Sequence, residues 1–261
     1  VTVIKNGDER TYKLANPQVI GNINYIETAD IEGVLYFDFE DLTIGVLVIK
    51  NEDKFEIQSI EGKSVLFKEF PLIGSENFNL PLFIQHRSFI PTEKRDGIST
   101  NKEDENAEDA IADTNRKCLQ EFTEKYKSFI KSLTNIEALG LYNIALSGLP
   151  ENTDNSLNIE WHKDNIQTPI RKLLYDYQLL KTVSGDYIKI ADAVFTEKDL
   201  IDDYDFYQII SKFLPEKVAC AEEYQLWNKI IHQEKDNWGD IKFITLKDLL
   251  QEIPDIVDLE N

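Results

Sequence analysis

Hydrophobic and polar residues alternate along the first 70 residues, which is the pattern of strands that bury one face. The apolar runs are rich in β-branched and aromatic residues, and polar turns such as Asn6-Gly7-Asp8 separate them. The expected strands are Thr2–Ile4, Tyr12–Leu14, Ile23–Glu27, Gly33–Phe39, Ile44–Ile49, Phe55–Ser59 and Ser64–Phe67. This pattern predicts an antiparallel β-meander.

Beyond this region the period of the pattern changes to three and four residues, which predicts a long amphipathic helix from about Ala107 to Leu133. Its apolar stripe consists of Ile111, Cys118, Leu119, Phe122, Tyr126, Phe129, Ile130 and Leu133. The preceding acidic stretch, Asn101–Asp109, suits a loop or a helix N-terminus. A second helix is expected at Ile136–Leu146. Strands followed by helices predict an α+β fold, with the meander packed on the long helix.

A linker is expected at Gly148–Asn158, which is rich in Gly, Pro, Asn and Asp. We therefore expect an α+β module at residues 1–147, a linker at 148–158 and a mostly helical module at 159–261. The elements expected in the last module are helices at Thr168–Leu174, Lys198–Phe213, Glu222–Glu234 and Leu246–Ile253, and a hairpin that joins Tyr177–Val183 to Tyr187–Ile190. Pro169 suits a first helical turn, and Thr245 with Asp248 suits a capping box.

The composition is that of an ordinary soluble protein, with 42% hydrophobic and 29% charged residues in 261. A net charge of −20 argues against nucleic acid as a partner, because phosphates would be repelled over most of the surface. No apolar run approaches the roughly 20 residues that span a bilayer. The three histidines are scattered, and Cys118 and Cys220 have no metal-ligand spacing, so we expect no metal site. Both cysteines suit core or boundary positions in the reducing cytoplasm.

The chain begins at Val1 inside an expected strand, and its first residues do not have the pattern of a signal peptide. We therefore expect it to be an internal segment of a longer protein. Several catalytic motifs are missing from the sequence, including a Walker-type phosphate loop and a GxGxxG turn. Ser75 lacks the second glycine of a nucleophile elbow. The isolated chain is therefore not expected to be an enzyme.

The segment Phe70–Ile98 departs from the strand and helix patterns around it. It contains three prolines and two glycines, and its apolar runs lead into the charged turn Thr92–Gly97. Arg95 lies in this turn, and Gly97 suits positive φ or a close backbone approach. A guanidinium at such a turn can reach outside its own domain, and its planar donors fit a phosphate.

This segment resembles the region after the ATP-binding domain in bacterial sacsin-like proteins, which are relatives of the ninety-kilodalton heat-shock chaperone in the GHKL superfamily. The family carries a Phe-Pro-Leu-Ile-Gly block, then Leu-Pro, then Phe-x-Pro-x-Glu-x-Arg-Asp. Here these blocks are Phe70–Gly74, Leu80–Pro81 and Phe89–Asp96. In the family a long helix with an Asn-Arg or Asn-Lys pair follows, and Asn115-Arg116 fits that place.

The resemblance implies a transducer or middle domain of a chaperone-like ATPase. ATP and magnesium would be bound by a domain upstream of this chain, and that domain and protein clients would be the partners. In this superfamily an arginine of the middle domain reaches the γ-phosphate, and the resemblance gives Arg95 that role. Glu93 and Asp96 would orient its guanidinium.

A second register of the resemblance leads to a different arginine. In the chaperone branch the arginine follows soon after Leu-Pro-Leu, and counting from Leu80 reaches His86, with Arg87 beside it. Arg87 is therefore the second candidate. Without the resemblance, the sequence favours a structural role for Arg95, in which its guanidinium pairs with Asp96 or Glu93 and only fixes the turn.

Two other functions remain open on the sequence. One is a non-catalytic, acidic scaffold that presents its aromatic C-terminal half to a protein partner. The other is a fragment of a hydrolase whose active residues follow no familiar motif. An ATP-binding motif in the reading frame upstream of Val1 would separate the coupling function from both.

Overall fold

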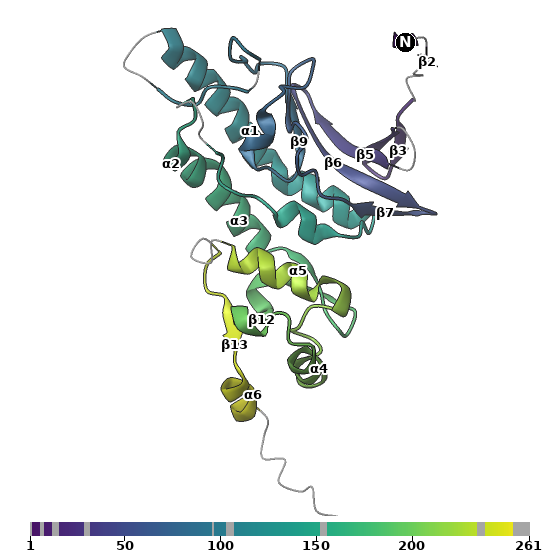
Figure 1. The fold of residues 1–261 in the computed structure, drawn as a ribbon, viewed down its shortest axis with the longest axis vertical. Helices are drawn as coiled ribbons and strands as arrows, with labels where there is room; N and C mark the ends of the chain where they lie inside the picture. The colour runs from purple at the N-terminus through teal and green to yellow at the C-terminus, as the bar shows by residue number, and fades with distance from the viewer. Residues whose placement is uncertain are drawn as a thin grey trace, which may run out of the picture. The chain divides into compact units, whose positions relative to one another are not determined.

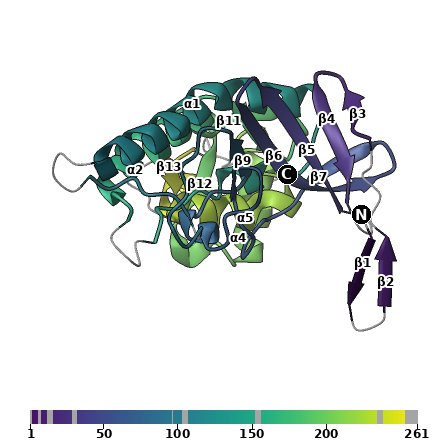
Figure 2. The ribbon, with the colours of Figure 1, turned by 90° about the horizontal axis from the view of Figure 1, so that it is seen from above.

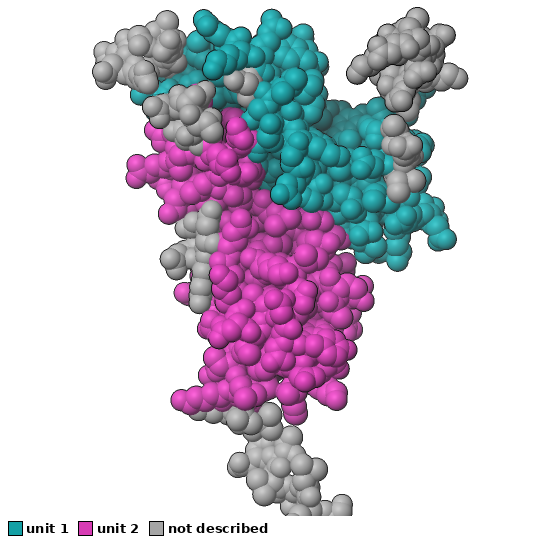
Figure 3. Space-filling view, viewed as in Figure 1, with its two compact units in different colours: residues 1–76, 80–139 teal, residues 77–79, 140–261 magenta. Residues whose placement is uncertain are grey.

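The structure is a computed structural model that describes residues 2–5, 8–11, 16–28, 32–95, 97–102, 107–151, 156–233 and 238–252 (Figure 1). It is an α+β fold, as the sequence predicts. The chain forms two compact units (Figure 3). The first comprises residues 1–76 and 80–139, and the second comprises residues 77–79 and 140–261. Each unit is described by itself below.

The first unit is built on a seven-stranded sheet in the order β3-β4-β5-β6-β9-β8, with β7 also paired to β6. These strands are β3 (Gln18–Ile20), β4 (Ile23–Glu27), β5 (Glu32–Phe39), β6 (Leu42–Asn51), β7 (Lys54–Ile57), β8 (Leu66–Phe67) and β9 (Phe83–His86). The antiparallel meander is confirmed from β3 to β7. A separate two-stranded hairpin, β1 (Thr2–Lys5) with β2 (Asp8–Thr11), precedes it (Figure 2). The strand expected at Tyr12–Leu14 lies outside the described residues.

The long strand β6 organises the sheet, because different strands pair with its two halves. The C-terminal half of β6 pairs with β7, with Val48 opposite Ile57. The N-terminal half of β6 pairs with β9, with Gly45 opposite Phe83. Strand β8 then adds in parallel to β9. The sheet is therefore more than a meander, since a segment from within the proline-rich region supplies one of its inner strands.

The predicted long helix is α1 (Ala107–Asn135), which packs against β6. Its apolar stripe lies in the core, where Phe122, Tyr126, Phe129 and Leu133 are completely buried. Burial raises the pKa of Tyr126 far above its ordinary value. The stripe and the inner face of the sheet thus form one hydrophobic layer, as expected for helix-on-sheet packing.

The second helix predicted at residues 136–146 is wrong. After α1, Glu137 adopts a left-handed conformation, and the Ala138 N–H bonds to the Leu133 carbonyl, which closes the helix with a Schellman motif. Leu139 then exchanges backbone hydrogen bonds with Phe55 and Ile57 beside β7. This tertiary pairing competes successfully with helix propensity, and only a 3₁₀ turn, η2 (Leu141–Ala145), follows.

The second unit is mostly helical, with two small sheets. Its helices are α2 (Ile159–His162), the π turn η3 (Lys163–Gln167), α3 (Thr168–Tyr175), the 3₁₀ turns η4 (Ile190–Asp192) and η5 (Lys198–Leu200), α4 (Tyr204–Phe213), α5 (Ala221–His232) and α6 (Leu246–Glu252). The predicted hairpin is β10 (Gln178–Lys181) with β11 (Tyr187–Lys189). The parallel pair β12 (Val194–Thr196) and β13 (Lys242–Ile244) was not predicted. Another 3₁₀ turn, η1 (Ser75–Phe78), lies where the chain passes from the first unit into the second.

The helix predicted at Thr168–Leu174 is confirmed as α3, with Pro169 in its first turn. The helical segment α2 and the π turn η3 precede it and were not predicted; α2 begins after Asn158, whose side chain accepts from the Trp161 N–H. The helix predicted from Lys198 begins only at Tyr204, because Asp203 caps the Phe206 N–H.

The Thr245 and Asp248 capping box is confirmed. The Asp248 N–H donates to the Thr245 hydroxyl, and the Asp248 carboxylate accepts from the Thr245 N–H at 3.0 Å. The Thr245 hydroxyl also donates to the Asp248 carboxylate at 2.6 Å, and this hydrogen bond, followed by that from the Thr245 N–H, lowers the pKa of Asp248. Glu252 is the last described residue of α6. The predicted end of this helix, Ile253, lies outside the described residues.

The linker predicted at residues 148–158 is described only in part, since residues 152–155 lie outside the described residues. Its first residues are tied into the second unit, where the Gly148 N–H bonds to the Asn79 carbonyl and the Glu151 N–H bonds to the Asn77 carbonyl. The change from one unit to the other comes earlier, at Leu139 and Gly140. A division of the chain into modules at residues 148–158 stays a prediction.

Candidate functional site

The first candidate, Arg95, lies in a tight turn whose backbone is closed by its own hydrogen bonds. The Thr92 N–H donates to the Gly97 carbonyl at 3.0 Å, and the Arg95 N–H donates to the Thr92 carbonyl at 2.9 Å. Pro91 and Ile98 pair below the turn as an isolated antiparallel bridge. Arg95 has a φ of 59°, which places a bulky residue in the left-handed region at a cost on the order of 1 kcal/mol.

A single buried side chain of α1 holds both stems of this loop. Asn115 is completely buried, and its carboxamide oxygen accepts from the Ile90 N–H at 2.8 Å. Its amide nitrogen donates to the Ile90 carbonyl and to the Ser99 carbonyl, each at 3.0 Å. The Arg116 Nε then donates to the Thr100 carbonyl at 2.8 Å. The Asn-Arg pair of the resemblance therefore fixes the loop that carries Arg95.

The Arg95 side chain is exposed and lies over an aromatic ring. Its guanidinium carbon is 5.3 Å from the centre of the Phe70 ring, which is itself partly exposed. A guanidinium stacked in this way keeps its planar donors available at the edge. Glu93 is exposed, and no ion pair joins it to Arg95 in the part of the chain that the structure describes. Asp96 lies outside the described residues, so the orienting roles of both acids stay predictions.

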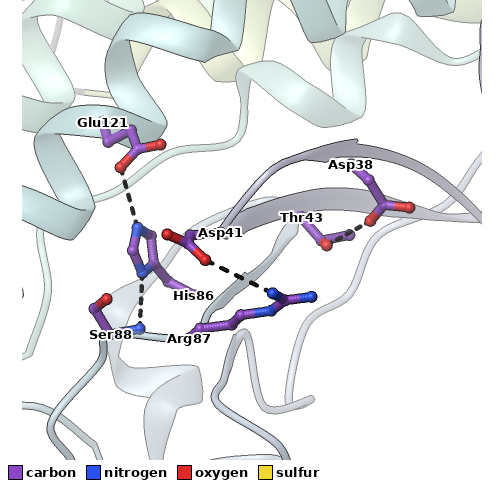
Figure 4. Close-up of polar contacts among 7 residues, drawn as sticks. All are labelled: Asp38, Asp41, Thr43, His86, Arg87, Ser88 and Glu121. Atoms are coloured by element: carbon purple, nitrogen blue, oxygen red, sulfur yellow. Dashed lines mark hydrogen bonds and ion pairs between the residues drawn. The ribbon is translucent and has the colours of Figure 1, made fainter.

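The second candidate, Arg87, follows β9 and lies in a polar cluster that sequence reasoning did not assemble (Figure 4). Its guanidinium is 3.8 Å from the Asp41 carboxylate, and both side chains are mostly exposed. Asp38 nearby accepts a 2.6 Å hydrogen bond from the Thr43 hydroxyl. Arg87 is thus engaged by a carboxylate of its own unit, and an exposed pair of this kind is weak.

His86, the residue before Arg87, is buried and points the other way, toward α1 (Figure 4). Its Nδ1 accepts from the Ser88 N–H at 3.1 Å, so the proton is on Nε2, which donates to the Glu121 carboxylate at 3.2 Å. Both ring nitrogens are occupied by protein groups. This arrangement ties β9 to α1, and it leaves the imidazole no free nitrogen for substrate chemistry.

The two thiols are poor candidates for nucleophiles. Cys118 is buried, and burial together with Glu121 raises its pKa to about 11. Burial and the neighbouring Glu223 raise the pKa of Cys220 to about 11 as well. Thiolates are the reactive form, so neither is activated at neutral pH. No group of three metal-ligating side chains occurs within the described ranges.

Many of the aromatic residues in the second unit are core residues, and others lie at its surface. Trp227, Trp238, Phe206 and Tyr207 are buried, whereas Tyr204 at the start of α4 is 70% exposed. Tyr187 and Phe213 are also exposed, at 38% and 44%. The buried aromatic residues therefore stabilise the core of the unit, and the exposed ones lie at its surface.

The structure places Arg95 and Arg87 in different surroundings, one on a loop tip and one on the sheet. Sequence reasoning missed Asn115 as the anchor, Phe70 as the stacking partner and Asp41 as the ion-pair partner of Arg87. The pair Asn115-Arg116 was noted only as part of a family pattern. A buried Asn in the middle of an apolar stripe is the sequence signal that could have identified the anchor, since buried amides need partners.

No family model, curated protein or solved structure matches this chain. Among the described helices, none combines the length and the apolar character needed to cross a membrane.

Proposed function

We propose that this chain is the coupling segment of a chaperone-type ATPase, in which the loop of residues 90–99 presents Arg95 to the γ-phosphate of ATP bound by another domain. One observation carries the proposal. An exposed arginine sits at the tip of a loop whose two stems are both bound by the buried Asn115 of the long helix. A cation mounted in this way is held in position before its ligand arrives, which lowers the entropic cost of binding.

The chemistry of the proposed role is electrostatic. The γ-phosphate gains charge on its peripheral oxygens during transfer, and a guanidinium that arrives only in the closed state stabilises that charge. ATP and magnesium would be held by the other domain, and this chain would supply the arginine and pass the change of state onward through α1. The resemblance of Phe70–Gly74 and Phe89–Asp96 to the sacsin-like proteins supports the same role.

The test is made on the protein encoded by the complete reading frame. Arg95→Ala should lower the ATP turnover on the order of a thousandfold, with little change in nucleotide affinity. Arg95→Lys keeps the charge but loses the planar fork, so it should restore only a small part of the rate. Arg95→Gly should abolish turnover equally while relieving the left-handed backbone strain, which separates the function of the side chain from the stability of the turn.

Arg87→Ala is the matched control, since it removes an exposed arginine from the same unit. Loss of turnover in Arg87→Ala with a normal rate in Arg95→Ala would transfer the role to Arg87. Normal turnover in both variants would refute the arginine mechanism and favour the non-catalytic scaffold. In calorimetry with magnesium and ATP, the isolated chain should show no binding, and micromolar affinity would contradict the coupling role as proposed.

A further inference from the structure

The sheet of the first unit has a hollow on the face opposite its buried layer. Strand alternation places Leu35, Ile44 and Val46 in the core, and the intervening residues face outward. The hollow has a volume of about 810 Å³, and its apolar lining comes from five neighbouring strands. This lining consists of Ile26, Val34, Tyr36, Gly45, Phe67 and Phe83.

Gly45 lies at the centre of the hollow, between Tyr36 on β5 and Phe83 on β9 in the strand register. A Cβ at this position would come within 3.1 Å of Val34 Cγ1 and 3.3 Å of Tyr36 Cβ. Val34 and Tyr36 therefore pack closely against the glycine, and a larger side chain at position 45 would have to displace them. Glycine in the interior of a strand marks a place where another group approaches closely, and here that group is the side chains of Val34 and Tyr36.

Charge is concentrated at one end of the hollow, around the turn between β5 and β6. Asp38, Glu40 and Asp41 are exposed anions there, and Arg87 is the cation among the described lining residues. Asp41 is partly neutralised by Arg87 at 3.8 Å, and Asp38 accepts hydrogen bonds from the neutral side chains of Asn24 and Thr43, with no ion pair to it among the described residues. The opposite end, at Ile26 and Val34, is apolar.

We propose that this hollow docks an amphipathic helix of a protein partner, with apolar side chains over Val34 and Gly45 and an arginine or lysine against Asp38. Charge complementarity selects this occupant. A second copy of this chain, with a net charge of −20, would be repelled, as would nucleic acid or an anionic membrane surface. A helix is also the element that covers the exposed face of a sheet in layered folds.

The dimensions of the face set the spacing on the partner helix. Val34 and Asp38 are four residues apart on β5, which is about 13 Å along a strand. A helix covers that distance in about nine residues, or two and a half turns. The partner should therefore carry its apolar anchors and its basic residue about two turns apart on one face. This inference is independent of ATP and of the proposed role of Arg95.

The probe for the experiment is a capped, alanine-based helical peptide with two leucines one turn apart and two arginines about two turns further along the same face. Methyl NMR of the whole chain, labelled at Ile and Val, reports where it binds. The probe should shift the methyl signals of Ile26 and Val34 and leave Ile188 in the second unit unchanged. Raising the salt from about 0.1 M to about 0.5 M should weaken the binding.

Variants and a matched probe test the chemistry. Asp38→Asn should weaken binding about three- to fivefold, whereas Asp53→Asn in the turn at the other end of β6 should have no effect. Val34→Lys places a cation among the apolar residues that line the hollow and should weaken binding about tenfold or more. Gly45→Val should block the hollow, and Val34→Lys keeps the test decisive if the glycine variant does not fold. A control peptide with glutamates in place of the arginines should not bind.

The inference is overturned by any of three results. One is the absence of methyl shifts at Ile26 and Val34 with the arginine probe at about 1 mM, a concentration that would detect even weak docking. Another is equal affinity for the glutamate peptide, which would remove the charge selection. The third is binding that Val34→Lys and Asp38→Asn leave unchanged, which would place the probe on another surface.

Discussion

Replacing Asn115 by alanine should destabilise the first unit and release the loop that carries Arg95. The buried carboxamide makes three hydrogen bonds to backbone groups of Ile90 and Ser99. At about 1 kcal/mol each, their loss amounts to about 3 kcal/mol. Alanine is the better helix former by roughly 0.5 kcal/mol, so the expected net loss in the free energy of unfolding is about 2 to 3 kcal/mol.

The assay has to report on the first unit, and tryptophan fluorescence does not. Trp161, Trp227 and Trp238, the three tryptophans of the chain, all belong to the second unit. Native-state hydrogen exchange followed by NMR resolves both units. In Asn115→Ala, the most protected amides of β6 and α1 should lose about 2 to 3 kcal/mol of protection. The amides of Thr92 and Arg95, which close the turn, should exchange faster still.

Thr114→Ala is the matched control, because it changes the neighbouring residue of the same helix. The Thr114 hydroxyl donates to the Ala110 carbonyl one turn back in the same helix, so its loss should change the free energy of unfolding by no more than about 0.5 kcal/mol. If the protection in Asn115→Ala equals that in Thr114→Ala, the side chain does not hold the loop. Asn115 would then not be the anchor of the loop that carries Arg95.

Three further predictions concern the second unit and the buried thiol of the first. Thr245→Ala removes the hydroxyl hydrogen bond, which is the main cause of the lowered pKa of Asp248, but keeps the backbone N–H bond, so an NMR titration should find that pKa raised toward its ordinary value; an unchanged pKa would mean that the hydroxyl is not its cause. Burial raises the pKa of Glu223, which accepts a hydrogen bond from the Trp227 indole, so the folded state binds this proton more firmly than the unfolded state. Stability should therefore fall as the pH rises through the raised pKa, and Glu223→Gln should be the more stable protein above it, with a difference that vanishes toward lower pH in urea titrations followed by tryptophan fluorescence. Cys118, with a pKa of about 11, should react slowly with a thiol reagent at about pH 8 until the unit unfolds, and rapid labelling of the folded chain would contradict its burial.

Much of the fold follows from local sequence patterns. The alternation of Ile23–Glu27 and the three- and four-residue period of the long helix are properties of neighbouring residues, and both elements form where these patterns predict them. The hairpin around Ser184-Gly185-Asp186 and the Thr245 capping box are equally local. In these places propensity, periodicity and capping all favour the same element, so the local sequence was sufficient to predict it.

The remaining features depend on contacts between residues far apart in the chain. Strand β9 forms because β6 offers a partner for it, and the chain after α1 is extended because Leu139 pairs beside β7. The same holds for the candidate sites. Arg95 was identified from a motif, but its mounting on Asn115 and the hollow around Gly45 arise from packing across distant segments. Neither a buried amide nor a glycine in a strand specifies its partners by itself, because those partners are chosen only when the layers pack together.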